Sequence, residues 1–379
     1  MSDFLDFNLV YELRNVINET NIFTDDPVEK EKFDLICAVM DRFDTSIMYF
    51  NENNIKPRNE NDIVLFFYHC CIIRDGIKEV LKILEIEKED TYIFENYCEK
   101  EPFLMSNDEY MGDDKFFEYL RSLFFAHPFL TSRAIPKPIK GEIQYSQYTM
   151  NDRGGFFKEL VDSLGVMVYS NKREMFHLFI KYDDIKEYIK LKYLTIYEII
   201  ESFQKIIDNK TEEWKKRKVN REQSSADILL DIIDILKERY NEDYDVRDLY
   251  DYYTCDITNK NNEEIVKKYR KEIENVIPRI CDCVDNMDYE EMYNIIRPLL
   301  NPFLREIYPM MHYQLEKIYC YLNDDYGDTK WGLKQAKLFA NEFAKDWVEI
   351  KIDEMSFIEI KLLVTIACYY QSKKEVACE

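Results

Sequence analysis

The stretch DIVLFFYHCCIIRDGIKEVLKIL at residues 62–84 is apolar or aromatic through most of its length. Apolar side chains fall on nearly all sides of the helix that it would form, which predicts a buried helix at the centre of a helical domain. Asp62 precedes the apolar run and is predicted to cap the N-terminus of this helix. A buried central helix needs other helices to cover it.

The sequence before this stretch predicts such covering helices. Residues 6–23 carry apolar side chains at helical spacing. Asp26 and Pro27 form a typical helix start, an N-cap residue followed by proline in the first turn, and predict a helix to about Asn51. We therefore predict a helical bundle over residues 1–135.

Residues 136–190 differ in character and are predicted to form an irregular insertion. The segments 165–170 and 175–181 are rich in β-branched and aromatic residues, and the polar residues between them predict a β-hairpin. Amphipathic helical patterns then resume and predict a C-terminal helical domain over residues 191–379. The predicted fold class is mainly α: a helical bundle with a small β-hairpin insertion and a C-terminal helical module.

The chain is strongly acidic, since its 379 residues include 74 Asp and Glu against 51 Lys and Arg, a net charge of −23. This charge disfavours nonspecific binding to duplex DNA or to anionic lipid. The N-terminus lacks the basic and apolar regions of a secretory signal, and no long window is free of charge, so we expect a cytoplasmic protein without a membrane span. Ten cysteines are then expected to stay reduced, and their spacing fits no zinc site, so neither metal nor cofactor is predicted.

Residues 116–128, FFEYLRSLFFAHP, hold the best candidates for chemistry. Any acid–base chemistry by an imidazole must use one of the four histidines. They are His69, His127, His177 and His312. At about 100° per residue, His127 falls within the apolar stripe of a helix, and Arg121 lies roughly 120° away. The two side chains would meet at one substrate if Pro128 distorts the last turn, or if two copies of the helix meet in a dimer.

This segment resembles the signature of the HEPN superfamily, an arginine followed by four to six residues and a histidine. Here it reads Arg121-Ser-Leu-Phe-Phe-Ala-His127, with Ser122 where the family usually has Asn, Asp or His. The resemblance covers about residues 1–130 and implies a helical bundle that forms a homodimer. It also implies a metal-independent endoribonuclease of a prokaryotic antiphage or toxin-type system.

The resemblance further implies a mechanism. A ribose 2′-OH attacks the adjacent phosphate and leaves a 2′,3′-cyclic phosphate. His127 would act as general base or acid. Arg121 would bind the nonbridging phosphate oxygens and stabilise the developing charge, and Ser122 would position a phosphate by hydrogen bonding.

The run Lys215, Lys216, Arg217 and Lys218, with Trp214 beside it, is the one candidate for binding an RNA backbone. Clustered cations neutralise phosphates, and an indole ring can stack on a base. A solvated helix end is the competing interpretation.

Two other classes of function stay open. In a non-catalytic interaction or scaffold protein, which binds a protein partner or a trigger, Arg121 and His127 only pack the bundle. In an acidic inhibitor that mimics nucleic acid, the excess carboxylates form the binding surface. A second match to the Arg–His spacing, Arg305 with His312, contains a proline and is interpreted as coincidence. A basic groove beside Arg121 would favour the ribonuclease, and an inaccessible His127 would favour the scaffold.

Overall fold

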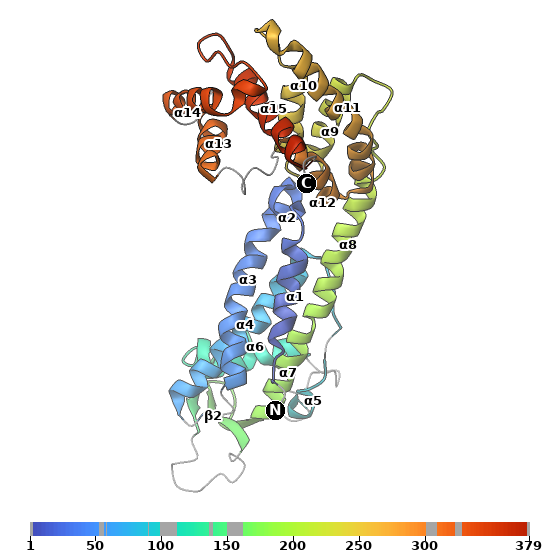
Figure 1. Cartoon of the computed structure of the whole chain (residues 1–379). Coiled ribbons are helices and arrows are strands. Elements are labelled where there is room, and N and C mark those ends of the chain that lie inside the picture. The colour runs from blue at the N-terminus through green and yellow to red at the C-terminus, as the bar shows by residue number, and fades with distance from the viewer. Residues whose placement is uncertain are drawn as a thin grey trace. The chain divides into compact units, whose positions relative to one another are not determined.

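A computed structural model describes residues 3–52, 57, 59–89, 91–98, 112–135, 139–149, 162–300, 309–322 and 328–376. For residues 309–311, 375 and 376 it describes the backbone alone. The chain divides into two compact units, Met1–Asp208 and Asn209–Glu379 (Figure 1). The described residues are mainly helical with one small antiparallel sheet, which confirms the predicted fold class.

The first unit is built around the predicted central helix. Its N-terminal helices are α1 (Phe7–Asn18), α2 (Ile22–Asp25), α3 (Pro27–Glu52) and α4 (Glu60–Ile83). The central helix, α4, packs against α3 and against α7 (Tyr182–Leu194). Asp62 does not cap α4 as predicted. Asn59 does so, because its side chain accepts the N–H of Asp62 at 3.0 Å, which makes Asp62 the third helical residue.

The rest of this unit contains short helices and the sheet. It comprises α5 (Glu95–Cys98), α6 (Asp113–Arg121), the π-helix η1 (Ser122–Ala126), β1 (Gln144–Tyr148), β2 (Ser163–Ser170) and β3 (Phe176–Lys181). The strands are antiparallel in the order β1-β2-β3, and β2 with β3 confirms the predicted hairpin. β1 was not predicted. Its sequence, QYSQY, is polar and carries no apolar alternation.

Aromatic rings pack α4, α6 and α7 together. Phe67 of α4 stacks on Phe124 with ring centroids 5.0 Å apart, and Phe117 of α6 stacks on Tyr188 of α7 at 5.0 Å. All four side chains are fully buried. Buried aromatic pairs contribute both area and ring–ring attraction, so the end of α6 is fixed firmly to the core.

The boundary between the units lies inside α8 (Ile196–Trp214), and the predicted ranges 1–135 and 136–190 both fall in the first unit. The second unit contains α9 (Ser225–Glu238), α10 (Tyr244–Thr254), α11 (Glu263–Asn286), α12 (Tyr289–Leu300), α13 (Pro309–Tyr321), α14 (Thr329–Glu342), α15 (Phe357–Val376) and the short 3₁₀ helices η3 (Lys260–Asn262) and η4 (Ala344–Asp346). α11 continues through Pro278. Among the described residues, no helix combines the length and the apolar character needed to cross a membrane.

Gly76 lies where α4 passes close to α3. A Cβ atom at this position would stand 2.6 Å from a ring carbon of Phe43 and 3.0 Å from a methyl group of Val39. We expect Gly76→Ala to lower the free energy of unfolding by about 1–3 kcal/mol, although alanine is otherwise the better helix former. Urea unfolding measures this. The double variant Gly76→Ala/Phe43→Leu should lose less free energy of unfolding than the sum of the two single variants, because the smaller side chain relieves the contact. A Gly76→Ala variant more stable than the native chain would contradict the close contact.

Candidate functional site

The predicted motif begins where α6 leaves α-helical geometry. The N–H of His127 donates to the carbonyl of Ser122 at 2.9 Å, a bond that spans five residues and defines a π turn. Phe124 is buried, as predicted for the apolar stripe, but His127 is exposed. The prediction that His127 lies within the stripe is therefore wrong. A π turn holds more residues than an α turn, so His127 is rotated away from the stripe that Phe116 begins.

Strand β1 satisfies the carbonyl groups that the π turn leaves free. The Ser146 hydroxyl donates to the carbonyl of Leu123 at 2.6 Å, and the Tyr148 hydroxyl donates to that of Phe124 at 2.6 Å. The Ser146 N–H donates to the carbonyl of Pro128 at 2.7 Å. Carbonyls at the end of a helix need such partners, and β1 thereby fixes the backbone on both sides of His127.

A second set of hydrogen bonds holds the backbone of His127 through Thr131 and Ser122. The Thr131 hydroxyl donates to the carbonyl of His127 at 2.8 Å and lies 3.1 Å from the hydroxyl of Ser122. Because a hydroxyl has one proton, Ser122 must be the donor to Thr131. Ser122 is buried, with 5% of its surface exposed, so its hydroxyl braces the loop of His127.

Arg121 belongs to an ion cluster that joins α6 to α4. Its Nη2 lies 3.0 Å from a carboxylate oxygen of Glu118, and its Nη1 lies 3.4 Å from one of Asp75. The buried Arg74 contacts the same two carboxylates, Asp75 at 2.5 Å and Glu118 at 2.6 Å. We call Arg74, Asp75, Glu118 and Arg121 the ion cluster. Its formal charges balance, which is the condition for holding Arg74 away from water.

The electrostatics of the cluster follow from this pairing. Burial acts to raise the pKa of Glu118, but the hydrogen bond and charge of Arg74, with the charge of Arg121, outweigh it and lower this pKa. Burial and the charge of Asp75 raise the pKa of the nearby Cys71 thiol to about 12, so this cysteine is not a nucleophile at neutral pH. The side chain of Arg121 is 31% exposed, and its Nε has no oxygen or nitrogen acceptor among the described residues.

His127 is the histidine best suited to proton transfer. It is exposed and directly follows the π turn. His69 is buried between α3 and α4, where its Nδ1 lies 3.1 Å from the Ser46 hydroxyl and its ring stacks on Tyr49. Burial lowers the pKa of His69 to about 4, which leaves it uncharged at neutral pH. In the part of the chain that is described, no group of three or more His, Cys, Asp and Glu could hold a metal ion.

The predicted RNA-binding run lies at the end of α8 and is largely paired. Lys215 contacts Glu212 at 3.0 Å, and Lys218 donates to the carbonyl of Asp285 at 2.7 Å. Arg217 binds the carboxylates of Asp231 and Glu238, and the hydrogen bond that it donates to Glu238 is the first cause of its raised pKa. Of the four, Lys215 and Arg217 pair with carboxylates of described residues, and Lys218 bonds to a backbone carbonyl. These cations therefore serve local folding of the second unit.

The second unit also contains a cavity of about 500 Å³. It is lined by Glu242, Tyr244, Asp245, Glu290, Tyr293, Asn294 and Arg297. Three carboxylates and one arginine line the cavity. Burial raises the pKa of Asp245, the charge of Arg297 lowers it and the charge of Glu242 raises it, so that the net effect is a raised pKa. A lining of this sign repels phosphate, so the cavity does not suit RNA.

Sequence reasoning missed most of what surrounds Arg121 and His127. The pair Arg74-Asp75 inside an otherwise apolar helix could have indicated an ion pair, because a buried charge needs a partner. Ser146 and Tyr148 gave no signal, since their role depends on contacts between segments far apart in the sequence. Comparisons with models of protein families, with curated proteins and with solved structures find no match.

Removing the Tyr148 hydroxyl tests whether β1 holds the π turn. Tyr148→Phe keeps the ring but leaves the Phe124 carbonyl without its donor, at a cost of about 1 kcal/mol. We expect the His127 amide, which donates to Ser122, to exchange with solvent roughly fivefold faster. Hydrogen exchange measured by NMR checks this. Tyr145→Phe, on the opposite side of β1, serves as the control, and equal exchange in both variants would contradict the bracing role.

The buried His69 predicts a pH dependence of stability. Its pKa is about 4 in the folded chain and about 6.5 in the unfolded chain, so between these values only the unfolded chain binds the proton. Stability is therefore complete above about pH 6.5 and falls as the pH falls toward 4, by at most about 3 kcal/mol. Unfolding midpoints from pH 7 to 4.5 should fall more steeply for the native chain than for His69→Gln. Parallel curves would disprove this assignment.

Proposed function

We propose that this chain is a metal-independent, HEPN-like endoribonuclease whose catalytic site lies at the end of α6. The supporting observation is the exposed imidazole of His127, held at the end of a π turn that begins directly after the partly exposed Arg121. π turns inside helices are frequent at functional sites because they place a side chain where a regular helix would not.

In the proposed reaction, the imidazole of His127 takes the proton of a ribose 2′-OH. The 2′-oxygen then forms a bond to the adjacent phosphorus while the bond to the 5′-oxygen breaks. The leaving oxygen takes up a proton, and the products are a 2′,3′-cyclic phosphate and a 5′-hydroxyl. Imidazole is suited to this proton transfer near neutral pH, and neither metal nor cofactor is required.

Arg121 is proposed to bind the phosphate. Its contact with Asp75 at 3.4 Å is longer than a strong hydrogen bond, whereas the 3.0 Å contact with Glu118 is well formed. A phosphate oxygen could thus replace Asp75 while Glu118 keeps the guanidinium oriented. The basic run at residues 215–218 is left out of the proposal, because most of its cations are already paired.

The biological setting comes from the family resemblance alone. We propose a prokaryotic antiphage or toxin-type system in the cytoplasm, with a homodimer whose second His127 supplies the acid for the leaving oxygen. A trigger or protein partner would bind elsewhere on the chain.

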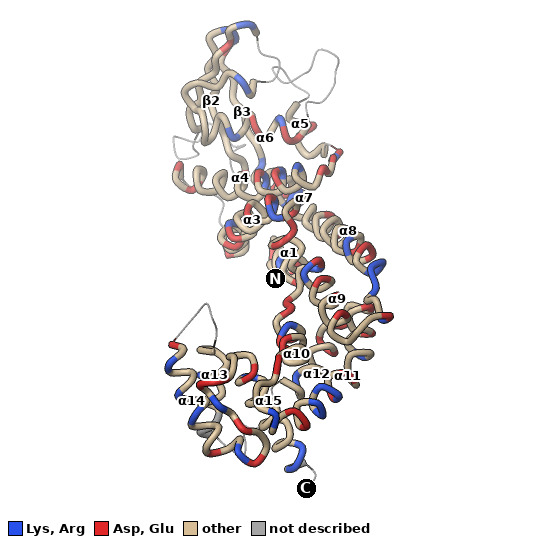
Figure 2. Tube along the Cα trace, turned by 90° about the horizontal axis from the view of Figure 1, so that it is seen from above, with Lys and Arg blue, Asp and Glu red and all other residues tan. Residues whose placement is uncertain are grey.

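A non-catalytic interaction protein is the second candidate, and the ion cluster is the observation that favours it. Arg121 pairs with Asp75 and Glu118 and so links α4 to α6, a structural role that needs no chemistry. The acidic mimic has no comparable observation in its favour, because basic residues are interspersed with acidic ones in both units (Figure 2).

Cleavage of total cellular RNA and tRNA in EDTA tests the proposal. We expect products with 2′,3′-cyclic phosphate ends, and rates at least about 100-fold lower for His127→Ala and for Arg121→Ala. His312→Ala is the matched control, because it removes the exposed histidine of the coincidental Arg305–His312 spacing and should cleave normally. Folded variants that cleave as fast as the native chain would disprove the assignment of these residues.

A further inference from the structure

The three-stranded sheet has one buried face and one open face. Neighbouring side chains along a strand point to opposite faces, and residues paired across strands share a face. The buried face carries Leu164, Val166, Val168, Leu178 and Ile180. The opposite, outward face carries Tyr145, Met167, Tyr169, His177 and Phe179. We call these five residues the aromatic face.

The aromatic face offers rings at a spacing suited to flat ligands. Tyr145 of β1 stands directly opposite Tyr169 of β2, and their exposed fractions are 39% and 42%. His177 and Phe179 of β3 are partly exposed, and their rings are nearly parallel, with centroids 6.0 Å apart. Tyr145 and Tyr169 are cross-strand neighbours about 5 Å apart, and Met167, which pairs with His177, lies between this pair and the rings of β3.

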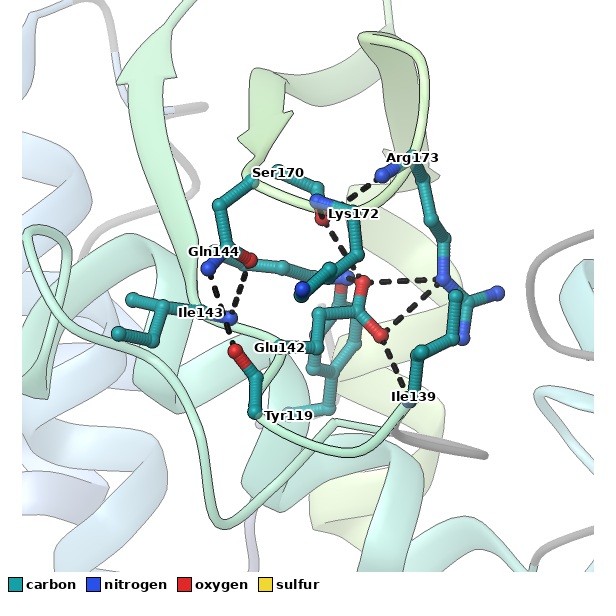
Figure 3. Close-up of polar contacts among 10 residues, drawn as sticks. Tyr119, Ile139, Glu142, Ile143, Gln144, Ser170, Lys172 and Arg173 are labelled. Atoms are coloured by element: carbon teal, nitrogen blue, oxygen red, sulfur yellow. Dashed lines mark hydrogen bonds and ion pairs between the residues drawn. The ribbon is translucent and has the colours of Figure 1, made fainter.

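A hydrogen-bond network around the buried Glu142 holds together the backbone segments that carry this face (Figure 3). The carboxylate of Glu142, whose side chain is fully buried, accepts bonds from Arg173 at 2.9 Å, Ser170 at 3.0 Å and Gln144 at 3.0 Å. The Tyr119 hydroxyl of α6 donates to Gln144 at 2.8 Å. The network joins β1 to the hairpin and to α6, so the aromatic face loses little conformational entropy when a ligand binds.

The aromatic face continues toward His127. Thr131 and Gln144 exchange both of their backbone hydrogen bonds, at 3.0 and 2.9 Å, so the segment after His127 runs along the edge of β1. Phe129 and Leu130 in that segment are 79% and 60% exposed. Exposed apolar side chains thus extend from the sheet to the residues that directly follow the candidate catalytic histidine.

Local charge favours a polyanion here although the whole chain is acidic. The described residues between 131 and 181 include five Lys and Arg against three Asp and Glu, whereas the whole chain has 51 against 74. Lys172, in the turn between β2 and β3, and Lys181, at the end of β3, are exposed. Figure 2 draws basic residues at this turn. Cations beside aromatic rings are the combination that binds single-stranded nucleic acid.

We propose that the aromatic face binds an unpaired segment of RNA, whose bases stack on Tyr145 and Tyr169. The delivery of its backbone to Arg121 and His127 rests on the proposed ribonuclease function, but the binding itself does not. A duplex is disfavoured because its base faces are covered by neighbouring base pairs, while an unpaired segment exposes them. The substrate class is therefore single-stranded RNA or an RNA loop.

Fluorescence anisotropy with a labelled single-stranded RNA, uniformly 2′-O-methylated and about 12 nucleotides long, tests the binding. The methyl group blocks attack by the 2′-oxygen, so no cleavage interferes. We expect Tyr145→Ala and Tyr169→Ala each to raise Kd by about tenfold, and Tyr145→Phe to keep Kd within about twofold, because the ring remains. Tyr11→Ala, which removes a tyrosine that is 59% exposed on α1, is the matched control and should bind normally.

The outcomes separate the two proposals. Binding that the tyrosine changes weaken, without cleavage of natural RNA, supports the aromatic face and counts against the ribonuclease. Cleavage that needs His127 but is indifferent to Tyr145 and Tyr169 overturns the aromatic face alone. Tighter binding of the corresponding duplex, or no binding of the single strand, also overturns the proposal for the aromatic face. Either result would favour a protein as the partner of this surface.

Discussion

The capping of the π turn by β1 is the interaction on which the first unit depends. A helix that ends in a π turn leaves carbonyl groups without partners, and in a packed interior each would cost free energy. Ser146 and Tyr148 supply the missing donors. This requirement sets the register of β1 against α6, and the register of β1 in turn decides which side chains of the sheet face outward.

The ion cluster imposes a second constraint. Arg74 is 3% exposed on a central helix, and an unpaired charge at such a place would be strongly destabilising. Asp75 and Glu118, which pair with Arg74, also contact Arg121. The same two carboxylates therefore stabilise the fold and orient the candidate site. The structural and the catalytic explanations of Arg121 are thus compatible, since the residue can hold α6 to α4 and still present unused donors.

Local signals in the sequence predicted the parts of the fold that depend on local chemistry. α3 begins at Pro27 with Asp26 accepting the N–H of Val28 at 2.9 Å, as its sequence indicates, and the hairpin follows from β-branched runs around a polar turn. The exposure of His127 had no such signal. It results from hydrogen bonds to a strand more than a dozen residues further along the chain, and that strand itself was missed because its alternation is polar.

An acidic chain that cleaves RNA needs a way to hold its substrate without relying on overall charge. Binding through many phosphate contacts requires many cations, and in the basic run after α8 Lys215 and Arg217 are paired with neighbouring carboxylates while Lys218 bonds to a backbone carbonyl. Base stacking needs few cations, because every base has a face that a ring can cover. Under our proposals, recognition by the aromatic face would restrict binding to unpaired RNA. The net charge of −23 would then disfavour duplex nucleic acid, which offers phosphates without exposed base faces.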